Sequence, residues 1–286
     1  MTSSLFVSPA WLQEHIHDPS VRILDARMLP PGYQGPRDLH AEYLAGHLPE
    51  AVIFDIEALS DSNSALPHML TSPEAFAAAM EALGVGDGQH LVVYDDGSLF
   101  SAPRAWWMLH VIAGVERVSL LAGGMAGWQR AGLPLAAGPV FQDPRTFRPH
   151  PSAGHVKSLA DMRHIIAHRS AQVIDARPAA RFSGQEPEPR PGLHRGHIPG
   201  SKNLPWHALV RDGELKSPEE LQSIVDKAGI DTGRPLVASC GSGVTAAVAV
   251  LALTELGIEG VALYDGSWSE WGGRDDVPIA TGEGND

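Results

Sequence analysis

The stretch Leu236-Val237-Ala238-Ser239-Cys240-Gly241-Ser242-Gly243-Val244-Thr245-Ala246 contains the only cysteine of this 286-residue chain. An apolar run typical of a buried strand ends at Ser239, a glycine-rich turn follows, and an alanine-rich stretch typical of a helix begins near Thr245. A sulfur at such a turn faces backbone N–H groups and a helix N-terminus, which both favour thiolate over thiol. A lone cysteine is usually a small apolar core residue, but this position favours a nucleophile.

The composition is that of a globular protein, with 43% hydrophobic and 19% charged residues. The formal net charge of −13 argues against nucleic acid or an anionic membrane as a main partner, because both require a basic surface. One cysteine excludes an internal disulfide and a thiolate zinc cluster. This cysteine usage suits a reducing compartment, so we expect a cytoplasmic protein.

Targeting and metal signals are absent from the sequence pattern. The segment Met1–Val7 lacks the basic and apolar regions of a secretory signal, and no apolar run approaches the roughly 20 residues of a membrane-spanning helix. The 14 histidines are scattered and form no His-Glu-x-x-His motif. We therefore expect no metal site and no membrane segment.

The chain repeats itself at a domain-sized interval. Val21–Arg27 returns as Gln172–Arg177, and Gly46–Ala51 returns as Gly196–Ser201, both 150 positions later. Such self-similarity indicates duplication. We expect two tandem domains, at residues 1–135 and 154–286. The proline-rich residues 136–153 between them are predicted to be a linker.

Each half alternates short β-rich runs with helical stretches. In the second half we expect strands at Val173–Asp175, Leu236–Ser239 and Val261–Tyr264. A helix is expected from Pro218, capped by Ser217, and another at Thr245–Leu256. This order predicts an α/β fold, in which each domain is a mostly parallel sheet flanked by helices.

The two halves differ at the position of the cysteine. Leu91–Asp95 aligns with Leu236–Cys240, so Asp95 stands where the second half has its thiol. The loop after Asp95 has no nucleophilic sulfur. We therefore expect the first domain to be non-catalytic and the second to carry the chemistry.

Three functions compete for the cysteine loop. A phosphatase-like Cys-x₅-Arg loop would need an arginine at Ala246, and without it a phosphoryl dianion lacks its main partner. A dinucleotide fingerprint fits the spacing of Gly241, Gly243 and Ala246, but it falls in the last strand–helix unit rather than the first. Sulfur transfer, in which Cys240 carries a persulfide held by the loop amides, fits without such conflicts.

On these motifs the whole chain resembles the tandem-domain rhodanese family. The loop Cys240–Thr245 is similar to that of the subgroup that uses 3-mercaptopyruvate as sulfur donor. Rhodaneses that use thiosulfate typically carry basic residues just after the cysteine, where this chain has the neutral Gly241 and Ser242. A dianionic donor gains from cations at the loop, whereas a monoanionic thiol acid needs its carboxylate held further away.

The resemblance implies a donor-binding role for two arginines in the segment 181–190. Arg181 and Arg190 would grip the carboxylate and keto group of the donor, for which the planar guanidinium is suited. The alternative is that both arginines pair with Glu186 and Glu188 on a surface loop.

The resemblance also implies a serine–histidine–carboxylate relay. Its members would be Ser242, His68 and either Glu57 or Asp55, which share one face if residues 54–57 form a strand. Sequence does not choose between the two carboxylates. His68 has the alternative role of a hydrogen-bonding residue without proton transfer.

Other motifs of the resemblance are interpreted as parts of the fold. They are the Asp-Ala-Arg sequences at Asp25 and Asp175, the histidines His47 and His197, and the segment Asp265–Trp271. Their polar groups are expected to brace loops. Trp268 and Trp271 are expected to pack the domain rather than stack on a ligand.

The implied activity is a 3-mercaptopyruvate sulfurtransferase activity without metal or organic cofactor. Cys240 would take sulfur from 3-mercaptopyruvate and release pyruvate, and the backbone amides of the loop would hold the persulfide; these belong to Gly241, Gly243, Val244 and Thr245. A small thiol, a thioredoxin-like protein or cyanide would accept the sulfur. The alternatives are a thiosulfate sulfurtransferase and a non-catalytic rhodanese-like binding module.

Overall fold

The computed structural model describes residues 5–152 and 154–284. Met1–Ser4, Ala153 and Asn285–Asp286 lie outside the described residues. The expectation that Met1–Val7 is no secretory signal falls partly on them, and Ala153 is part of the predicted linker. The described chain divides into two units. The first comprises residues 5–62, 70–152 and 212–214, and the second comprises residues 63–69, 154–211 and 215–284.

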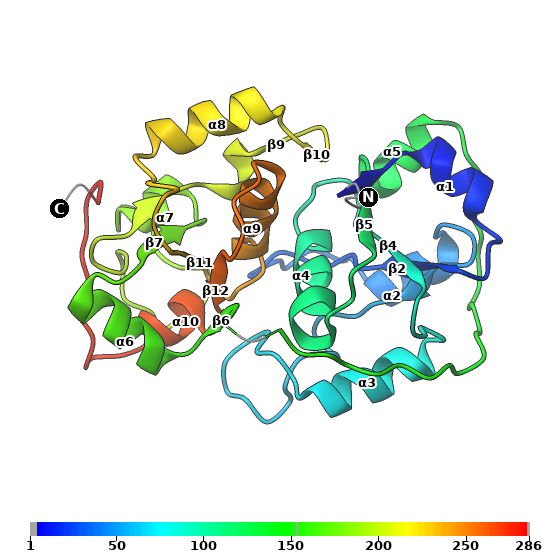
Figure 1. The fold of residues 1–286 in the computed structure, drawn as a ribbon, viewed down its shortest axis with the longest axis horizontal. Helices are drawn as coiled ribbons and strands as arrows, with labels where there is room; N and C mark the ends of the chain where they lie inside the picture. The colour runs from blue at the N-terminus through cyan, green and yellow to red at the C-terminus, as the bar shows by residue number, and fades with distance from the viewer. Residues whose placement is uncertain (1–4, 153, 285–286) are drawn as a thin grey trace. The chain divides into compact units, whose positions relative to one another are not determined.

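The first unit contains a five-stranded parallel sheet in the order β1-β5-β4-β2-β3, of which Figure 1 labels β5, β4 and β2. Its strands are β1 (Phe6–Val7), β2 (Val21–Asp25), β3 (Val52–Ile53), β4 (His90–Tyr94) and β5 (Val118–Leu121). Its helices are α1 (Pro9–His15), α2 (Leu39–Ala45), α3 (Pro73–Ala82), α4 (Ala102–Ala113) and α5 (Gly124–Arg130). Residues of α1 and α5 join the strands in one buried apolar cluster.

The second unit repeats this sheet in the order β6-β12-β11-β7-β8. Its strands are β6 (Val156–Lys157), β7 (Gln172–Asp175), β8 (Lys202–Asn203), β11 (Leu236–Ser239) and β12 (Ala262–Tyr264). Its helices are α6 (Leu159–His168), α7 (Ala179–Phe182), α8 (Pro218–Lys227), α9 (Ala246–Glu255) and α10 (Ser267–Trp271). A 3-10 turn at Trp206–Ala208 and a short β9–β10 ribbon (Val210–Arg211 and Glu214–Leu215) complete the chain.

The predicted α/β fold with two similar parallel sheets is confirmed. All four residues of β11 are buried. Continuous apolar runs of this kind are typical of parallel strands that helices cover on both faces of the sheet. Helix α9 is apolar on all sides and buried from Ala246 to Leu253, against β11 and β12. Helices α6 and α10 join a cluster that includes Val173 and Val237.

The proline-rich stretch after residue 135 lies against the first unit in its described part. Ala136 N–H donates to the carbonyl of His47, and the N–H groups of His150 and Ser152 donate to carbonyls of α4. Four prolines in this stretch lack a backbone donor, and the N–H of Gly138 donates to the carbonyl of Leu44. The limits of the two domains stay a prediction, because the units also exchange the short segments 63–69 and 212–214.

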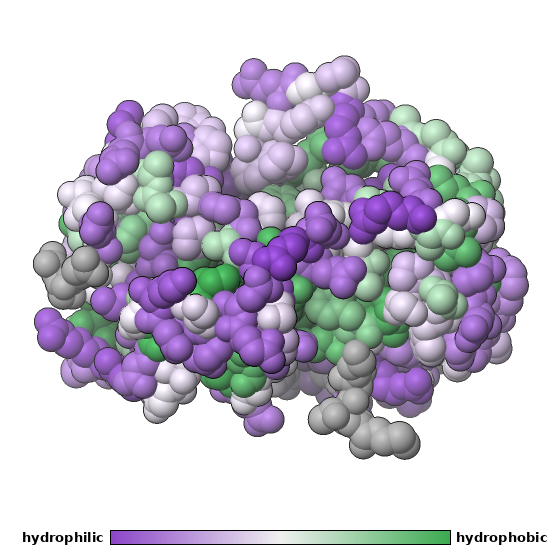
Figure 2. All heavy atoms as spheres, turned by 90° about the horizontal axis from the view of Figure 1, so that it is seen from above, coloured by the Kyte–Doolittle hydropathy of each residue, from purple (hydrophilic) through white to green (hydrophobic). Residues whose placement is uncertain are grey.

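The face of the molecule drawn in Figure 2 is largely polar. Hydrophilic side chains cover much of the face in Figure 2, with smaller apolar patches between them. Large exposed apolar side chains among the described residues are Tyr33, Leu135 and Phe141. No helix in residues 5–152 and 154–284 has the length and apolar character needed to cross a membrane.

Helix α8 depends on the predicted cap at its start. The Ser217 hydroxyl accepts from the N–H of Glu220, and the Glu220 carboxylate accepts from the N–H of Ser217. This reciprocal pair satisfies two donors that a helix N-terminus otherwise leaves open. Only Leu221 and Val225 of the helix are buried, so packing contributes little beyond one stripe.

We predict that Ser217→Ala lowers the free energy of unfolding by about 1 kcal/mol, because the N–H of Glu220 loses its partner. The control is Ser223→Ala, the same change at an exposed mid-helix position, where alanine is the better helix former. Urea denaturation followed by circular dichroism measures both. Equal losses in the two variants would contradict the assignment.

Candidate active site

Cys240 lies at the carboxyl end of the central part of the second sheet. It follows β11 directly and precedes α9. The chain leaves β7 toward β8 on one side and leaves β11 toward β12 on the other. Such a switch point opens a crevice at the carboxyl ends of the two strands, where α/β proteins bind their ligands.

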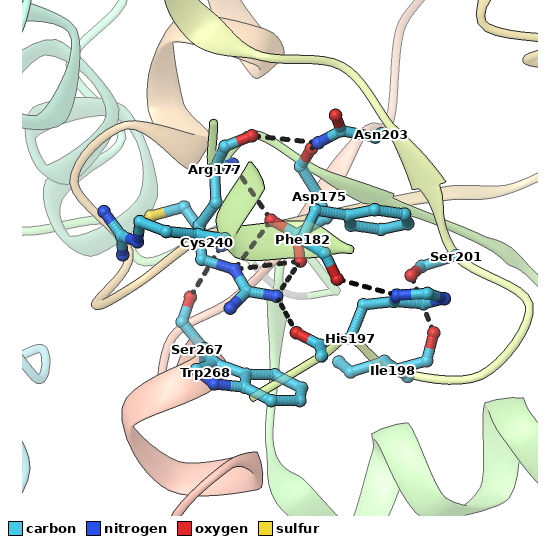
Figure 3. A network of polar contacts seen from close by, with 12 residues as sticks. Asp175, Arg177, Phe182, His197, Ile198, Ser201, Asn203, Cys240, Ser267 and Trp268 are labelled. Atoms are coloured by element: carbon cyan, nitrogen blue, oxygen red, sulfur yellow. Dashed lines mark hydrogen bonds and ion pairs between the residues drawn. The ribbon is translucent and has the colours of Figure 1, made fainter. Parts of the chain in front are cut away.

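The backbone around Cys240 is held by α10. The N–H of Cys240 donates to the Ser267 hydroxyl at 3.2 Å (Figure 3), and that hydroxyl donates to the carbonyl of Tyr264 at 2.8 Å. The N–H of Trp268 donates to the carbonyl of Cys240 at 2.9 Å. Ser269 donates to the carbonyl of Gly241 through its N–H and its hydroxyl, at 2.8 and 2.7 Å.

The loop itself reverses direction at Gly243, whose φ of +79° is in the left-handed region. Cys240, Ser242 and Val244 are nearly fully buried. The loop ends at the N-terminus of α9, which has no side-chain cap. Backbone N–H groups at such a terminus attract an anion.

A chain of buried charges lies beside the loop (Figure 3). The Arg177 guanidinium binds both oxygens of Asp175, at 2.6–3.1 Å, and also donates to the carbonyl of Gly196 at 2.8 Å. It stacks on the Trp268 ring, 4.3 Å from the ring centre. Burial alone would lower the pKa of Arg177, but the carboxylates of Asp175 and Glu188 outweigh burial and raise this pKa.

Arg181 lies between these charges and the cysteine loop. Its Nη2 is 2.6 Å from Oε2 of Glu188, which also binds Arg177 at 2.7 Å through Oε1. A Cβ atom added to Gly241 would meet Nη2 of Arg181 at 3.3 Å. The predicted carboxylate pairing of Arg181 is thus present, yet it occurs next to the loop rather than on an isolated surface. Arg190 lies half-buried in the same segment.

His68 and Ser242 are in direct contact within the second unit. The His68 Nδ1 is 2.9 Å from the Ser242 Oγ, and both residues are about 2% exposed. His68 has a φ of +59°. A non-glycine residue in the left-handed region carries backbone strain, which is often found at functional sites.

The two predicted carboxylates belong to the first unit. Asp55 and Glu57 were expected to share one face if residues 54–57 formed a strand. Residues 54–57 do not form a strand, because β3 ends at Ile53 and residues 56–59 form a turn. Oδ1 of Asp55 accepts from the N–H groups of Glu57 and Ala58, at 3.0 and 3.2 Å. An aspartate favours this local bonding over a strand. Both carboxylates line a pocket of about 340 Å³ in that unit. Their part in a relay stays a prediction.

The first unit has a similar loop after β4, in which Asp95 stands at the position of Cys240. The N–H of Met125 donates to the carbonyl of Asp95 at 2.9 Å, as the N–H of Trp268 does to that of Cys240. The Asp95 carboxylate accepts from four loop amides at 2.9–3.3 Å; they belong to Gly97, Leu99, Ser101 and Ala102. Amides of this loop are therefore bonded to the protein's own carboxylate.

The expected bracing residues are buried and bonded. His197 Nδ1 is 2.9 Å from the carbonyl of Phe182, and His47 Nε2 is 2.9 Å from that of Gly138. Trp268 and Trp271 are within 1% of complete burial, and their indole N–H groups donate to backbone carbonyls. Within residues 5–152 and 154–284, no three His, Cys, Asp or Glu side chains form a group that could hold a metal ion.

Sequence reasoning missed two site features. The sequence places Ser267 among the fold-defining residues, and in the structure its hydroxyl also accepts from the N–H of Cys240. Glu188 was considered only as a surface partner, although its side chain is 2% exposed and binds two arginines. The sequence signal for this pairing is a glutamate that follows Arg177 and Arg181. Spacing along the chain does not reveal that the side chain of Glu188 is buried.

Comparison with known proteins agrees with this geometry. A model of the rhodanese-like domain matches residues 8–131 and 158–274. The 3-mercaptopyruvate sulfurtransferase of Escherichia coli K12 is 54% identical over 98% of this chain and 99% of its own length. A thiosulfate sulfurtransferase of Cricetulus griseus is 40% identical over 93% of this chain and 91% of its own length.

A solved structure has the same fold over almost all of the chain. This is the crystal structure of SseA, a 3-mercaptopyruvate sulfotransferase from Escherichia coli. Its sequence is 53% identical to this chain, and the two structures superpose with a TM-score of 0.86. It covers 94% of this chain, and the match spans 100% of that structure. The family model matches both halves of the chain, the two sheets have the same strand order, and the similar relatives span both halves. The chain therefore belongs to the rhodanese family.

Proposed function

We propose that the chain is a sulfurtransferase that moves sulfur from 3-mercaptopyruvate to a thiol or cyanide and releases pyruvate. The observation that carries this is the position of Cys240, between a switch-point strand and an uncapped helix N-terminus, with Arg181 directly against the neutral Gly241. The names of the 54% identical relative and of the matched structure support the choice of donor.

The donor binds with its carboxylate end toward Arg181 and Arg190. Arginine pairs with a carboxylate in two parallel hydrogen bonds and so fixes the orientation of the donor. The Cys240 thiolate then attacks the donor sulfur. A bond forms between the two sulfur atoms, the carbon–sulfur bond breaks, and the electron pair leaves with pyruvate as its enolate.

Two proton transfers accompany this step: the donor thiol loses a proton, and the enolate gains one at carbon. Ser242 and His68 are in hydrogen-bond contact and form the relay for them, with Glu57 or Asp55 as the carboxylate. General acid–base catalysis of this kind contributes a factor on the order of 10² to 10⁴.

The second half-reaction returns the cysteine to its starting state. A thiolate or cyanide attacks the outer sulfur of the Cys240 persulfide, forms a new bond to it and releases the Cys240 thiolate. The amides of Gly241, Gly243, Val244 and Thr245 stabilise the persulfide anion between the two steps. The acceptor is a small thiol or a thioredoxin-like protein. Neither half-reaction requires a metal or organic cofactor. A free cysteine suits the reducing cytoplasm.

Thiosulfate is the second candidate donor, because a relative 40% identical to this chain bears that name. Its two negative charges would be best held by cations beside the cysteine. The residues after Cys240 are neutral, and a basic side chain at position 241 would start 3.3 Å from the guanidinium of Arg181. Like-charge repulsion therefore disfavours a basic residue there. A non-catalytic binding module is disfavoured by the buried, intact cysteine loop.

We predict that kcat/KM for 3-mercaptopyruvate exceeds that for thiosulfate by at least roughly tenfold, which corresponds to about 1.4 kcal/mol of differential transition-state binding. Purified protein is assayed with each donor, using dithiothreitol and cyanide as acceptors. A preference for thiosulfate would keep the family and reject the donor. Absence of turnover with both donors would favour the binding module.

We predict that Cys240→Ser forms no persulfide, because a hydroxyl cannot accept the sulfur in this step. The protein is incubated with donor in the absence of acceptor, and its intact mass is measured. The control Asp95→Asn changes the equivalent position of the first unit and is expected to gain one sulfur atom like the wild type. A sulfur adduct on the Cys240→Ser protein would disprove the assignment.

We predict that Ser242→Ala and His68→Gln each lower kcat at least tenfold, and that the double variant is no slower than the slower single variant. Residues that act as one unit give such non-additive losses. The pH dependence of kcat is measured for all three proteins. Additive losses with an unchanged pH profile would assign His68 a structural role only.

A further inference from the structure

Glu188 occupies an unusual position for a carboxylate in an extended surface segment. Its side chain is 2% exposed. Its Oε1 accepts from Nη1 of Arg177 at 2.7 Å and from Nε of Arg181 at 3.3 Å, and its Oε2 accepts from Nη2 of Arg181 at 2.6 Å. One buried carboxylate therefore holds two guanidinium groups.

The charges of this cluster balance. Arg177 and Arg181 carry two positive charges, and Asp175 and Glu188 carry two negative charges. Asp175 is bonded to Arg177 through both oxygens, so Glu188 is the carboxylate that compensates Arg181. Arg181 has a side chain that is 21% exposed and lies against Gly241 of the cysteine loop. The cation nearest to the loop in this cluster is thus already paired.

This pairing has two effects on an incoming anion. The orientation of Arg181 is constrained, because Nε and Nη2 are engaged by Glu188, and a guanidinium is planar with five N–H groups. The electric field of Arg181 at the loop is also reduced, because an opposite charge is less than 3 Å away. Directional hydrogen bonds remain available to a carboxylate, while the attraction of Arg181 for a second negative charge is weakened.

We propose that Glu188 determines donor specificity by cancelling the charge of Arg181, so that the Cys240 site accepts a monoanionic carboxylate donor and discriminates against dianionic thiosulfate. The donor named here rests on the proposed function. The charge effect itself does not, because it is a property of the field at the Cys240 sulfur.

The field at the sulfur can be measured without sulfur transfer. Cys240 is the only cysteine of the chain, so alkylation reports on it alone. The ratio of second-order rates for iodoacetate and iodoacetamide compares an anionic with a neutral reagent on the same thiolate. Accessibility and thiolate population affect both reagents and largely cancel in this ratio.

Glu188→Gln keeps the size of the side chain and removes its charge. We expect the iodoacetate-to-iodoacetamide ratio to rise roughly fivefold, since one unit of positive charge is uncovered near the sulfur. The matched control is Glu186→Gln, the same charge change at an exposed position two residues away, which leaves the ratio within about 1.5-fold of the wild type by solvent screening. Equal ratios in the two variants would overturn the proposal.

A second comparison covers the case in which Glu188→Gln does not fold. Arg181→Gln leaves the cluster with one excess negative charge, and the double variant Arg181→Gln, Glu188→Gln restores balance. The ratio is expected to be lower than wild type in Arg181→Gln and to recover in the double variant. Recovery isolates the charge of Glu188, and its absence would reject the charge effect.

The donor assay then separates this inference from the proposed function. With Glu188→Gln, kcat/KM for thiosulfate relative to 3-mercaptopyruvate is expected to rise roughly fivefold, and with Glu186→Gln it is expected to stay constant. If the wild type prefers thiosulfate, the proposed donor fails while the alkylation ratio still decides the charge effect. A changed alkylation ratio with unchanged donor preference would reject the role of Glu188 in specificity.

Discussion

The buried ion pair between Asp175 and Arg177 is the interaction on which the arrangement of the site depends. Two charges removed from water are strongly unfavourable unless each is fully hydrogen-bonded. Arg177 meets this condition with Asp175, Glu188, the carbonyl of Gly196 and the face of Trp268. The end of β7, the segment that contains Glu188, the loop at Gly196 and α10 are thereby joined at one guanidinium.

The same buried ion pair is present in both units, although the residues of the adjacent loops differ. Arg27 binds Asp25 and the carbonyl of Gly46 in the first unit, as Arg177 binds Asp175 and the carbonyl of Gly196 in the second. The loop after β4 directs four backbone amides at the carboxylate of Asp95. The first unit therefore has no thiol at that position. In the second unit the corresponding position is Cys240, at the end of β11.

Local signals in the sequence predicted much of the second unit. Strands β7, β11 and β12 and helix α9 lie within one residue of their expected bounds, and helix α8 begins at the expected Pro218. Apolar runs, the Ser217 cap and glycine turns act over a few neighbouring residues, so they can be recognised in the sequence. The turn at Asp55 was missed, since its carboxylate competes for the backbone only once the strand has ended. The packing of residues 136–152 was missed for a related reason: their partners are carbonyls far away in sequence.

The duplication, the parallel α/β architecture and the single cysteine at a strand–helix turn can be predicted from the sequence alone, because each of these follows from periodicity, spacing or residue count along the chain. Which polar groups share a buried space becomes clear only in the folded chain. The contact of His68 with Ser242, the bond of Ser267 to the N–H of Cys240 and the double pairing of Glu188 join residues from separate segments. Burial and charge compensation are properties of such assembled neighbours, so no local pattern specifies them.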